Sequence, residues 1–134
     1  HAEYNKDLDE FKHWLFNFKD LKLILIKGNH DRLKQAIYDD FNIDVYQPSL
    51  ELEAIQFVHD IVETQNNVFT ISGHTHPGVL LKGKGRQRIK LPCFQVTKNQ
   101  LILPAFSLFT GLNTKNAPKN CTNYGFTEDA IFEV

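Results

Sequence analysis

Residues 69–78 have the sequence FTISGHTHPG, a short apolar run that ends in a glycine and two histidines one residue apart. The apolar part is typical of a buried strand. Because residues i and i+2 of an extended segment point to the same side, we expect His74 and His76 to converge on one place. Gly73 and Gly78 allow the backbone to turn sharply around them. The stretch therefore predicts a strand that delivers metal ligands at its carboxyl end.

Two further strands are expected to end in polar loops that carry histidines. The run LKLILIK at 21–27 leads directly into GNHD at 28–31, and the alternating apolar residues from 50 to 58 end at His59. Amide oxygen and imidazole nitrogen together suit zinc, manganese or iron. A lone histidine at a strand end is more often a hydrogen-bonded surface or core residue than a ligand. Histidines at three strand ends nevertheless favour one shared site.

The remaining pattern predicts an α/β or α+β fold in which strands dominate the C-terminal half. Helices are expected over 5–17, with Asn5 as N-cap, and over 32–41. Other extended or hairpin segments are expected at 43–47, 79–90, 91–106 and 126–134, with a polar linker at 61–67 and a loop at 110–123. Cys93, Phe106 and Phe109 are expected in the core.

The bulk properties limit the class of protein. With 134 residues, of which 42% are apolar and 23% charged, the chain fits a single domain over 1–134. Its net charge of -1 weakens a general role in coating DNA. No apolar run approaches the roughly 20 residues of a membrane helix and no signal peptide opens the chain, so we expect a cytoplasmic protein without membrane association. The two cysteines lack the spacing of a disulfide framework or a zinc finger and are interpreted as reduced.

A row of basic residues follows the histidine pair. Every even position from 82 to 90 is basic, which gives Lys82, Lys84, Arg86, Arg88 and Lys90. Strand alternation puts such residues on one face, and the two glycines around Lys84 indicate a hairpin turn. Five like charges would attract a phosphate backbone, so the row is predicted to bind substrate. The alternative is a solvated hairpin face.

The order of these motifs carries a resemblance. GNHD at 28–31, the lone His59 and GHTH at 73–76 resemble the later motifs of the calcineurin-like metallophosphoesterase superfamily. GHTHPG at 73–78, GKGRQRIKLPCF at 83–94 and LPAFSLFTG at 103–111 more narrowly resemble the bacterial ligase-associated DNA-damage-response metallophosphoesterases. The resemblance spans nearly the whole chain. It implies a two-sheet sandwich flanked by helices, of which this chain would be the C-terminal portion.

The resemblance also implies a site for two divalent metal ions, with manganese ahead of iron or zinc. Asn29, His59 and His74 would hold one ion, and His76 would contribute to the other. His30 would act as the acid that protonates the leaving oxygen. The reaction would be hydrolysis by metal-activated water.

Two candidate catalytic residues each have two interpretations. Asp31 would either orient His30 or cap the helix expected from Arg32. His1 matches the last residue of the family's second motif and would face the ligands or the substrate. The alternative is that His1 is a chain end without a role.

The motifs Asp-x-His and Gly-Asp that open the family pattern do not occur in the sequence. Without their carboxylates, one ion would keep three neutral ligands and the other only one. A chain that began at His1 is therefore expected to bind metal weakly and to catalyse little. Partner strands would also be missing, which would expose apolar edges. We therefore expect a domain that lacks its N-terminal part.

The resemblance implies a phosphodiesterase or nuclease that acts on nucleic acid in DNA repair, in functional association with a DNA ligase or helicase system. The same metal core supports two other enzyme classes, a phosphomonoesterase and a cyclic-nucleotide phosphodiesterase. A different class of protein is a non-catalytic metal-binding or DNA-binding module.

Overall fold

The computed structural model describes residues 4–60, 68–107 and 109–134. The chain divides into two units, His1–Pro48 and Ser49–Val134. The structure is mixed α/β with mostly strands, as the sequence predicts. His1 and the predicted polar linker at 61–67 lie outside the described residues. None of the described helices is long and apolar enough to cross a membrane.

The first unit contains one pair of parallel strands and two helices. Its elements are α1 (Lys6–Leu15), β1 (Leu23–Ile26), α2 (Gln35–Asp40) and β2 (Ile43–Tyr46). In the register of β1 and β2, Leu23 lies opposite Ile43, and α2 forms the crossover between the two strands. The rings of Phe11 on α1 and Phe41 after α2 stack with their centroids 5.9 Å apart. The loop that contains the GNHD sequence therefore leaves the carboxyl end of β1.

The two helix starts differ in how well the sequence predicts them. Asn5 caps α1 as expected, because its Oδ1 accepts a hydrogen bond of 3.1 Å from the backbone N–H of Leu8. The second helix begins at Gln35 rather than at Arg32. Asp31 is not its N-cap, since Asp31 Oδ2 instead accepts a hydrogen bond of 2.7 Å from the Gly28 N–H. The capping interpretation of Asp31 is therefore wrong, and the carboxylate closes the preceding turn.

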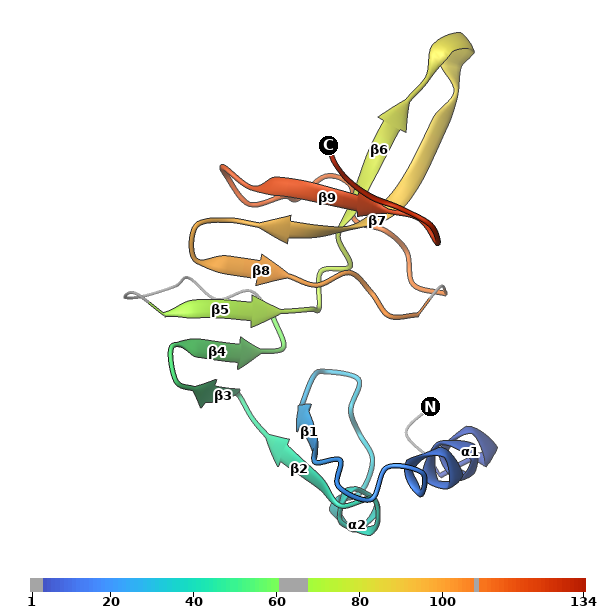
Figure 1. Ribbon diagram of the computed structural model, residues 1–134, viewed down its shortest axis with the longest axis vertical. Coiled ribbons are helices and arrows are strands. Elements are labelled where there is room, and N and C mark those ends of the chain that lie inside the picture. The colour runs from blue at the N-terminus through green and yellow to red at the C-terminus, as the bar shows by residue number, and fades with distance from the viewer. Residues whose placement is uncertain (1–3, 61–67, 108) are drawn as a thin grey trace. The chain divides into compact units, whose positions relative to one another are not determined.

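The second unit contains a mixed sheet of eight strands. Its elements are β3 (Ser49–Leu52), β4 (Ile55–Val58), β5 (Phe69–Ser72), β6 (Gly78–Lys82), the short 3-10 helix η1 (Lys84–Arg86), β7 (Arg88–Val96), β8 (Gln100–Ile102), β9 (Thr122–Phe126) and β10 (Ile131–Glu133). The strand order is β10-β9-β7-β8-β5-β4-β3, and β6 pairs with β7 outside this path. β4, β5 and β8 run parallel to one another, so their carboxyl ends lie at one edge of the sheet (Figure 1).

Two segments that the sequence predicts as single strands are hairpins. Residues 50–58 form β3 and β4, which turn at Glu53, a residue with φ of 55°. The sequence predicts a loop over 110–123 and one strand over 126–134, whereas residues 122–126 and 131–133 form the hairpin of β9 and β10. The apolar positions change from even at Leu50 and Leu52 to odd at Ile55 and Phe57, and this change of parity marks the first turn. The first hairpin places β3 at one end of the strand order, and the second places β10 at the other end.

The two faces of the sheet differ in burial. The register places Ile71 between Phe57 and Leu101 on one face, and all three side chains are only half-buried. The opposite face carries fully buried side chains, among them Thr70 and Ile102. Among the described residues, the face of the sheet that carries Ile71 is therefore both more apolar and more exposed to solvent than the opposite face.

Gly78 begins β6 at a point where no side chain fits. A Cβ added there would lie 2.8 Å from Leu112 Cβ and 3.1 Å from the Leu91 carbonyl oxygen. We expect Gly78→Ala to lower the free energy of unfolding by about 1–3 kcal/mol because the neighbours must move. The measurement is a urea denaturation curve. Gly111→Ala is the control, since a Cβ there meets nothing within 4 Å; equal losses in both variants would contradict the prediction.

Cys93 is a core residue, as predicted, and its side chain is fully buried. Burial, with a smaller effect of Cys121, raises the pKa of the Cys93 thiol from 9.0 to about 11. The folded state therefore keeps this proton while the unfolded state releases it. The stability that the neutral buried thiol contributes is complete below pH 9 and is lost as the pH rises to about 11.

This difference predicts one reactive thiol in the native protein. Cys121 is partly exposed and should react with a thiol reagent at pH 8, whereas Cys93 should react only after unfolding in denaturant. The measurement is a thiol count with and without denaturant. Two equivalents of rapid reaction in the native state would show that Cys93 is accessible.

Candidate functional site

His59 and His74 lie side by side at the carboxyl ends of two neighbouring parallel strands. His59 follows β4 and His74 follows β5. The carbonyl oxygen of His59 accepts hydrogen bonds from the N–H groups of Gly73, at 3.2 Å, and His74, at 3.1 Å. These bonds tie the two loops together, and His74 Nδ1 lies 2.9 Å from His59 Nε2. The structure thus brings these two predicted ligands into contact.

The geometry of this histidine pair fits a divalent metal ion. Two nitrogen ligands at normal bond lengths from one ion, at angles of roughly 90–110°, lie roughly 2.9–3.4 Å apart. The separation of 2.9 Å between the two ring nitrogens falls at the short end of this range. Within residues 4–60, 68–107 and 109–134, no group of three or more His, Cys, Asp or Glu side chains is placed to hold a metal. The sequence predicts the amide oxygen of Asn29 as a further ligand, and this stays a prediction.

Asp60 joins the histidine pair, although the sequence patterns did not single it out. Asp60 Oδ2 lies 3.8 Å from His74 Nε2, the ring nitrogen that does not face His59. Carboxylates commonly stand behind metal-binding histidines, where they fix the orientation of the imidazole and make it a better ligand. The available signal was the position of Asp60, directly after His59.

His76 is positioned by a turn and not by a strand. β5 ends at Ser72, and His76 has a positive φ of 49°. The expectation that strand alternation aligns His74 with His76 is therefore wrong, because the hydrogen bonds to His59 curl the backbone from Gly73 onward. The carbonyl oxygen of His76 accepts a hydrogen bond of 2.9 Å from the Asn113 N–H. Its role as a ligand stays a prediction.

The other predicted metal-binding and catalytic residues belong to the first unit. Asn29 and His30 are exposed and lie in the turn at the carboxyl end of β1. Arg32 Nε donates a hydrogen bond of 3.2 Å to the Asn29 carbonyl oxygen, and Asp31 closes the same turn through Gly28. The turn therefore holds these side chains at a strand end, as expected. Their roles, like that of His1, stay predictions.

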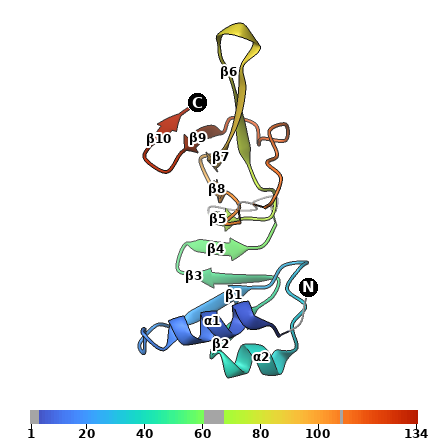
Figure 2. The ribbon, with the colours of Figure 1, turned by 90° about the vertical axis from the view of Figure 1, so that its right-hand side faces the viewer.

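The basic row forms a hairpin that projects from the sheet in both views (Figure 1, Figure 2). In the register of β6 and β7, Lys82 lies opposite Arg88 and Leu80 opposite Lys90. Alternation along the strands puts Lys82, Arg88 and Lys90 on one face, while the two remaining basic residues lie in the turn. All five are exposed, and none is paired with a carboxylate within the described part of the chain. Like charges directly opposite each other destabilise a hairpin. An anionic partner that neutralises them would remove this repulsion, so this face is suited to bind one.

Phe106 and Phe109 are not core residues, which corrects the prediction from sequence. Their exposed fractions are 106% and 101%, as high as in an extended peptide. They lie in the loop that follows β8, at the same edge of the sheet as His59 and His74. Pro104 comes two residues after the end of β8, and a proline cannot donate the hydrogen bond that a continuing strand needs.

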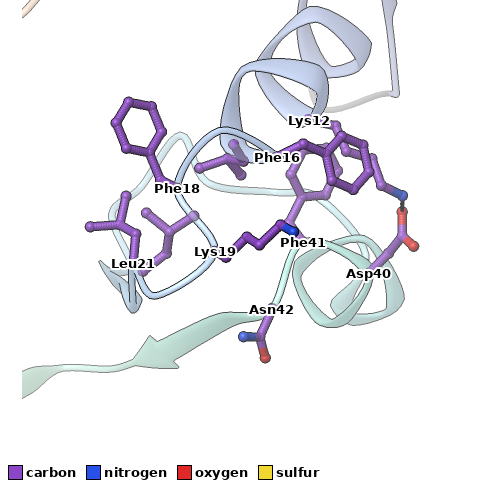
Figure 3. A pocket seen from close by; sticks show the side chains of 10 residues that line it. Lys12, Phe16, Phe18, Lys19, Leu21, Asp40, Phe41 and Asn42 are labelled. Carbon is purple, nitrogen blue, oxygen red and sulfur yellow. Dashed lines mark hydrogen bonds and ion pairs between the residues drawn. The ribbon is translucent and has the colours of Figure 1, made fainter.

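A separate hollow in the first unit contains none of the predicted site residues. Its volume is about 260 Å³, and Figure 3 shows the aromatic rings and the ion pair that line it. Lys12 pairs with Asp40 at its rim, and Phe16, Phe18 and Phe41 contribute apolar surface. The histidine pair therefore remains the better candidate for chemistry.

A solved structure has a similar fold. Nuclease MPE from Pseudomonas putida matches the chain with a TM-score of 0.76 and 29% sequence identity, over 95% of this chain and 60% of that chain. The chain resembles a nuclease. It spans about 60% of the length of nuclease MPE. No protein-family model matches the chain, and no curated protein matches it significantly.

The likeness to nuclease MPE supports a nuclease-related or phosphoesterase-related fold. It covers 95% of the chain. The mixed sheet with few helices corresponds to part of nuclease MPE.

Proposed function

We propose that this protein is a metal-dependent phosphodiesterase that cleaves nucleic acid. The observation that carries the proposal is the histidine pair, with two imidazole nitrogens 2.9 Å apart at a sheet edge. The likeness to nuclease MPE supports the same reaction class. A role in DNA repair, in the cytoplasm and beside a DNA ligase or helicase, rests on the motif resemblance and is proposed with it.

The residues have the following proposed roles. Asn29, His59 and His74 would hold one divalent ion and His76 would contribute to a second, with Mn²⁺ ahead of Fe²⁺ or Zn²⁺. Two such ions, when bound, supply positive charge to the phosphoryl oxygens and activate the attacking water. His30 donates a proton to the leaving oxygen.

Asp60 is proposed to position the metal-binding His74, and Asp31 to position the turn that carries Asn29 and His30. The Asp60 carboxylate behind His74 would keep Nδ1 of that ring directed at the metal site. The hydrogen bond from Gly28 to Asp31 holds the turn that carries Asn29 and His30. In this role Asp31 orients His30 through the backbone and not by touching the substrate.

The basic hairpin is proposed to bind the phosphate backbone of the substrate. Its base at Gly78 lies two residues after His76, so the cations extend directly from the histidine-bearing loop. Backbone phosphates bound there would lead the strand toward the metal site. Such binding weakens steeply with salt, because it releases counterions from the nucleic acid.

The finer fold is proposed to be a two-sheet sandwich of the calcineurin-like metallophosphoesterase type. Support comes from the half-exposed apolar face around Ile71, which is suited to pack on a second layer. The order of the GNHD, His and GHTH motifs supports the same family.

A non-catalytic metal-binding module is the second candidate. It is favoured by the histidine pair taken alone, since two imidazole nitrogens 2.9 Å apart can bind a metal ion without any catalytic step. The two candidates differ in whether hydrolysis accompanies metal binding.

The test is an activity assay on the product of the whole reading frame, with the 134-residue chain measured alongside. Substrates are bis-p-nitrophenyl phosphate, p-nitrophenyl phosphate, and DNA with and without breaks, each with Mn²⁺ or with a chelator. We expect Mn²⁺-dependent cleavage of the diester and of DNA. A strong preference for the monoester would overturn the nuclease proposal, and Mn²⁺ binding without hydrolysis would favour the binding module.

A further inference from the structure

The loop after β8 is anchored to the histidine-bearing loop at both ends. At its start, the Leu103 N–H donates a hydrogen bond of 2.7 Å to the carbonyl oxygen of Ser72, the last residue of β5. At its end, Asn113 bonds to the backbone of His76 and Gly78, at 2.9 Å in each case. The loop therefore begins and ends within a few residues of the predicted metal ligands.

The polar groups at the tip of this loop bond to one another and leave two aromatic rings in solvent. Ser107 Oγ accepts a hydrogen bond of 3.2 Å from the Phe109 N–H, and Thr110 Oγ1 donates one of 2.9 Å to the Ser107 carbonyl oxygen. Phe106 and Phe109 are fully exposed. A pair of fully exposed phenylalanines on an anchored loop is unusual for a surface without a partner.

The charge around the loop indicates which partner the rings would meet. The basic hairpin begins at Gly78, the residue whose N–H is bonded to Asn113 at the end of the loop. The basic hairpin, which could bind a phosphate backbone, and the loop with the two phenylalanine rings, which could bind flat apolar groups, are thus joined at their bases. Proteins that hold unpaired nucleic acid combine these two elements, with bases stacked on aromatic side chains.

We propose that Phe106 and Phe109 form a base-binding site in which unpaired bases of the nucleic acid stack on the two rings, beside the metal ligands. The proposal rests on the proposed function. The hairpin would hold the backbone and the two rings would hold the bases, so that the scissile phosphate is positioned at the histidine pair.

The test compares two oligonucleotides that carry the same phosphates. Binding to oligo-dT and to an abasic oligonucleotide of equal length is measured by fluorescence anisotropy over a range of salt concentrations, without divalent metal. Phe106→Ala and Phe109→Ala should each weaken oligo-dT binding by about 5- to 100-fold. They should leave abasic binding and the salt dependence unchanged, because the lost ring carries no charge. Phe16→Ala, which removes an exposed ring of the first unit, is the control.

A spectroscopic readout checks that the ring itself meets the base. The chain has one tryptophan, so Phe106→Trp in a Trp14→Phe background places a single fluorophore on the loop. Its emission should be quenched by oligo-dT and not by the abasic strand. Equal quenching by both strands would contradict stacking.

The outcomes separate this inference from the proposed function. If the wild-type protein binds oligo-dT but the Phe106→Ala/Phe109→Ala double variant binds it equally well, the base-binding site is wrong while the nuclease proposal stands. If the wild-type protein binds neither strand and cleaves no DNA, both proposals fail. If sedimentation shows a wild-type dimer that the double variant dissolves, the rings bind a second copy of the chain and the base-binding site is overturned.

Discussion

Replacing either histidine of the pair is expected to abolish most of the proposed phosphodiesterase activity. His74→Ala should lower kcat on bis-p-nitrophenyl phosphate by more than about 100-fold, because it removes one of two imidazole nitrogens that lie 2.9 Å apart. His59→Ala should have an effect of the same size. The measurement is the initial rate at saturating substrate with Mn²⁺, together with circular dichroism to confirm folding.

The controls for this prediction use a distant histidine and the double variant. His13 lies on α1, where its Nδ1 is 2.7 Å from the Asp9 carbonyl oxygen, so His13→Ala should keep activity within about twofold. The variant that lacks both His59 and His74 should be little worse than either single variant, because ligands of one ion act as a unit. Retention of a third of the activity by a single variant, or losses that multiply in the double variant, would show that the pair is not one metal site.

Removing the charges on one face of the basic hairpin is expected to weaken nucleic-acid binding by about 100-fold at 0.1 M salt. The variant combines Lys82→Ala, Arg88→Ala and Lys90→Ala, which lie on one face by register. For single strands, each lost phosphate contact reduces the magnitude of the negative slope of log Kobs against log salt concentration by about 0.7, so this magnitude should fall by about 2. The measurement is fluorescence anisotropy of a labelled oligonucleotide over a salt series.

Lys98 supplies the matched control for the hairpin. It is an exposed lysine of the same unit, in the turn that connects β7 to β8, at the opposite end of β8 from the loop with Phe106. Lys98→Ala should leave both the affinity and the slope unchanged. If it lowers the slope as much as each hairpin residue does, binding follows the overall charge of the chain and the hairpin has no special role.

The sequence predicted the elements that depend on local patterns. The polar cap of α1 at Asn5, the strand before the GNHD turn, and the β6–β7 hairpin with its turn near Gly85 all follow from side-chain type within a few residues. The expected burial of that strand is wrong, because Leu23, Leu25 and Ile26 are only half-buried and Ile24 is exposed. The contact between His59 and His74 was also predicted, because both residues follow apolar strands. What made the contact close is the parallel pairing of β4 with β5, a feature of topology that the sequence only implied.

The errors arose where the backbone was decided by hydrogen bonds between distant residues. Gly73 and His74 both bond to the carbonyl oxygen of His59, which ends β5 early and turns His76 out of the strand. Phe106 and Phe109 are apolar, and composition alone puts such residues in a core. Their exposure follows from a loop that is anchored at Ser72 and Asn113, and no local pattern predicts those anchors.

A crystal soaked with Mn²⁺ tests the metal site most directly, by anomalous scattering at the manganese edge. The expected result is a peak at bonding distance, roughly 2.0–2.3 Å, from both His59 Nε2 and His74 Nδ1. The same map shows whether the Asn29 amide oxygen bonds to this ion and whether His76 bonds to a second one. A protein that hydrolyses diesters at the soaked Mn²⁺ concentration but shows no peak between these two ring nitrogens would contradict the proposed site.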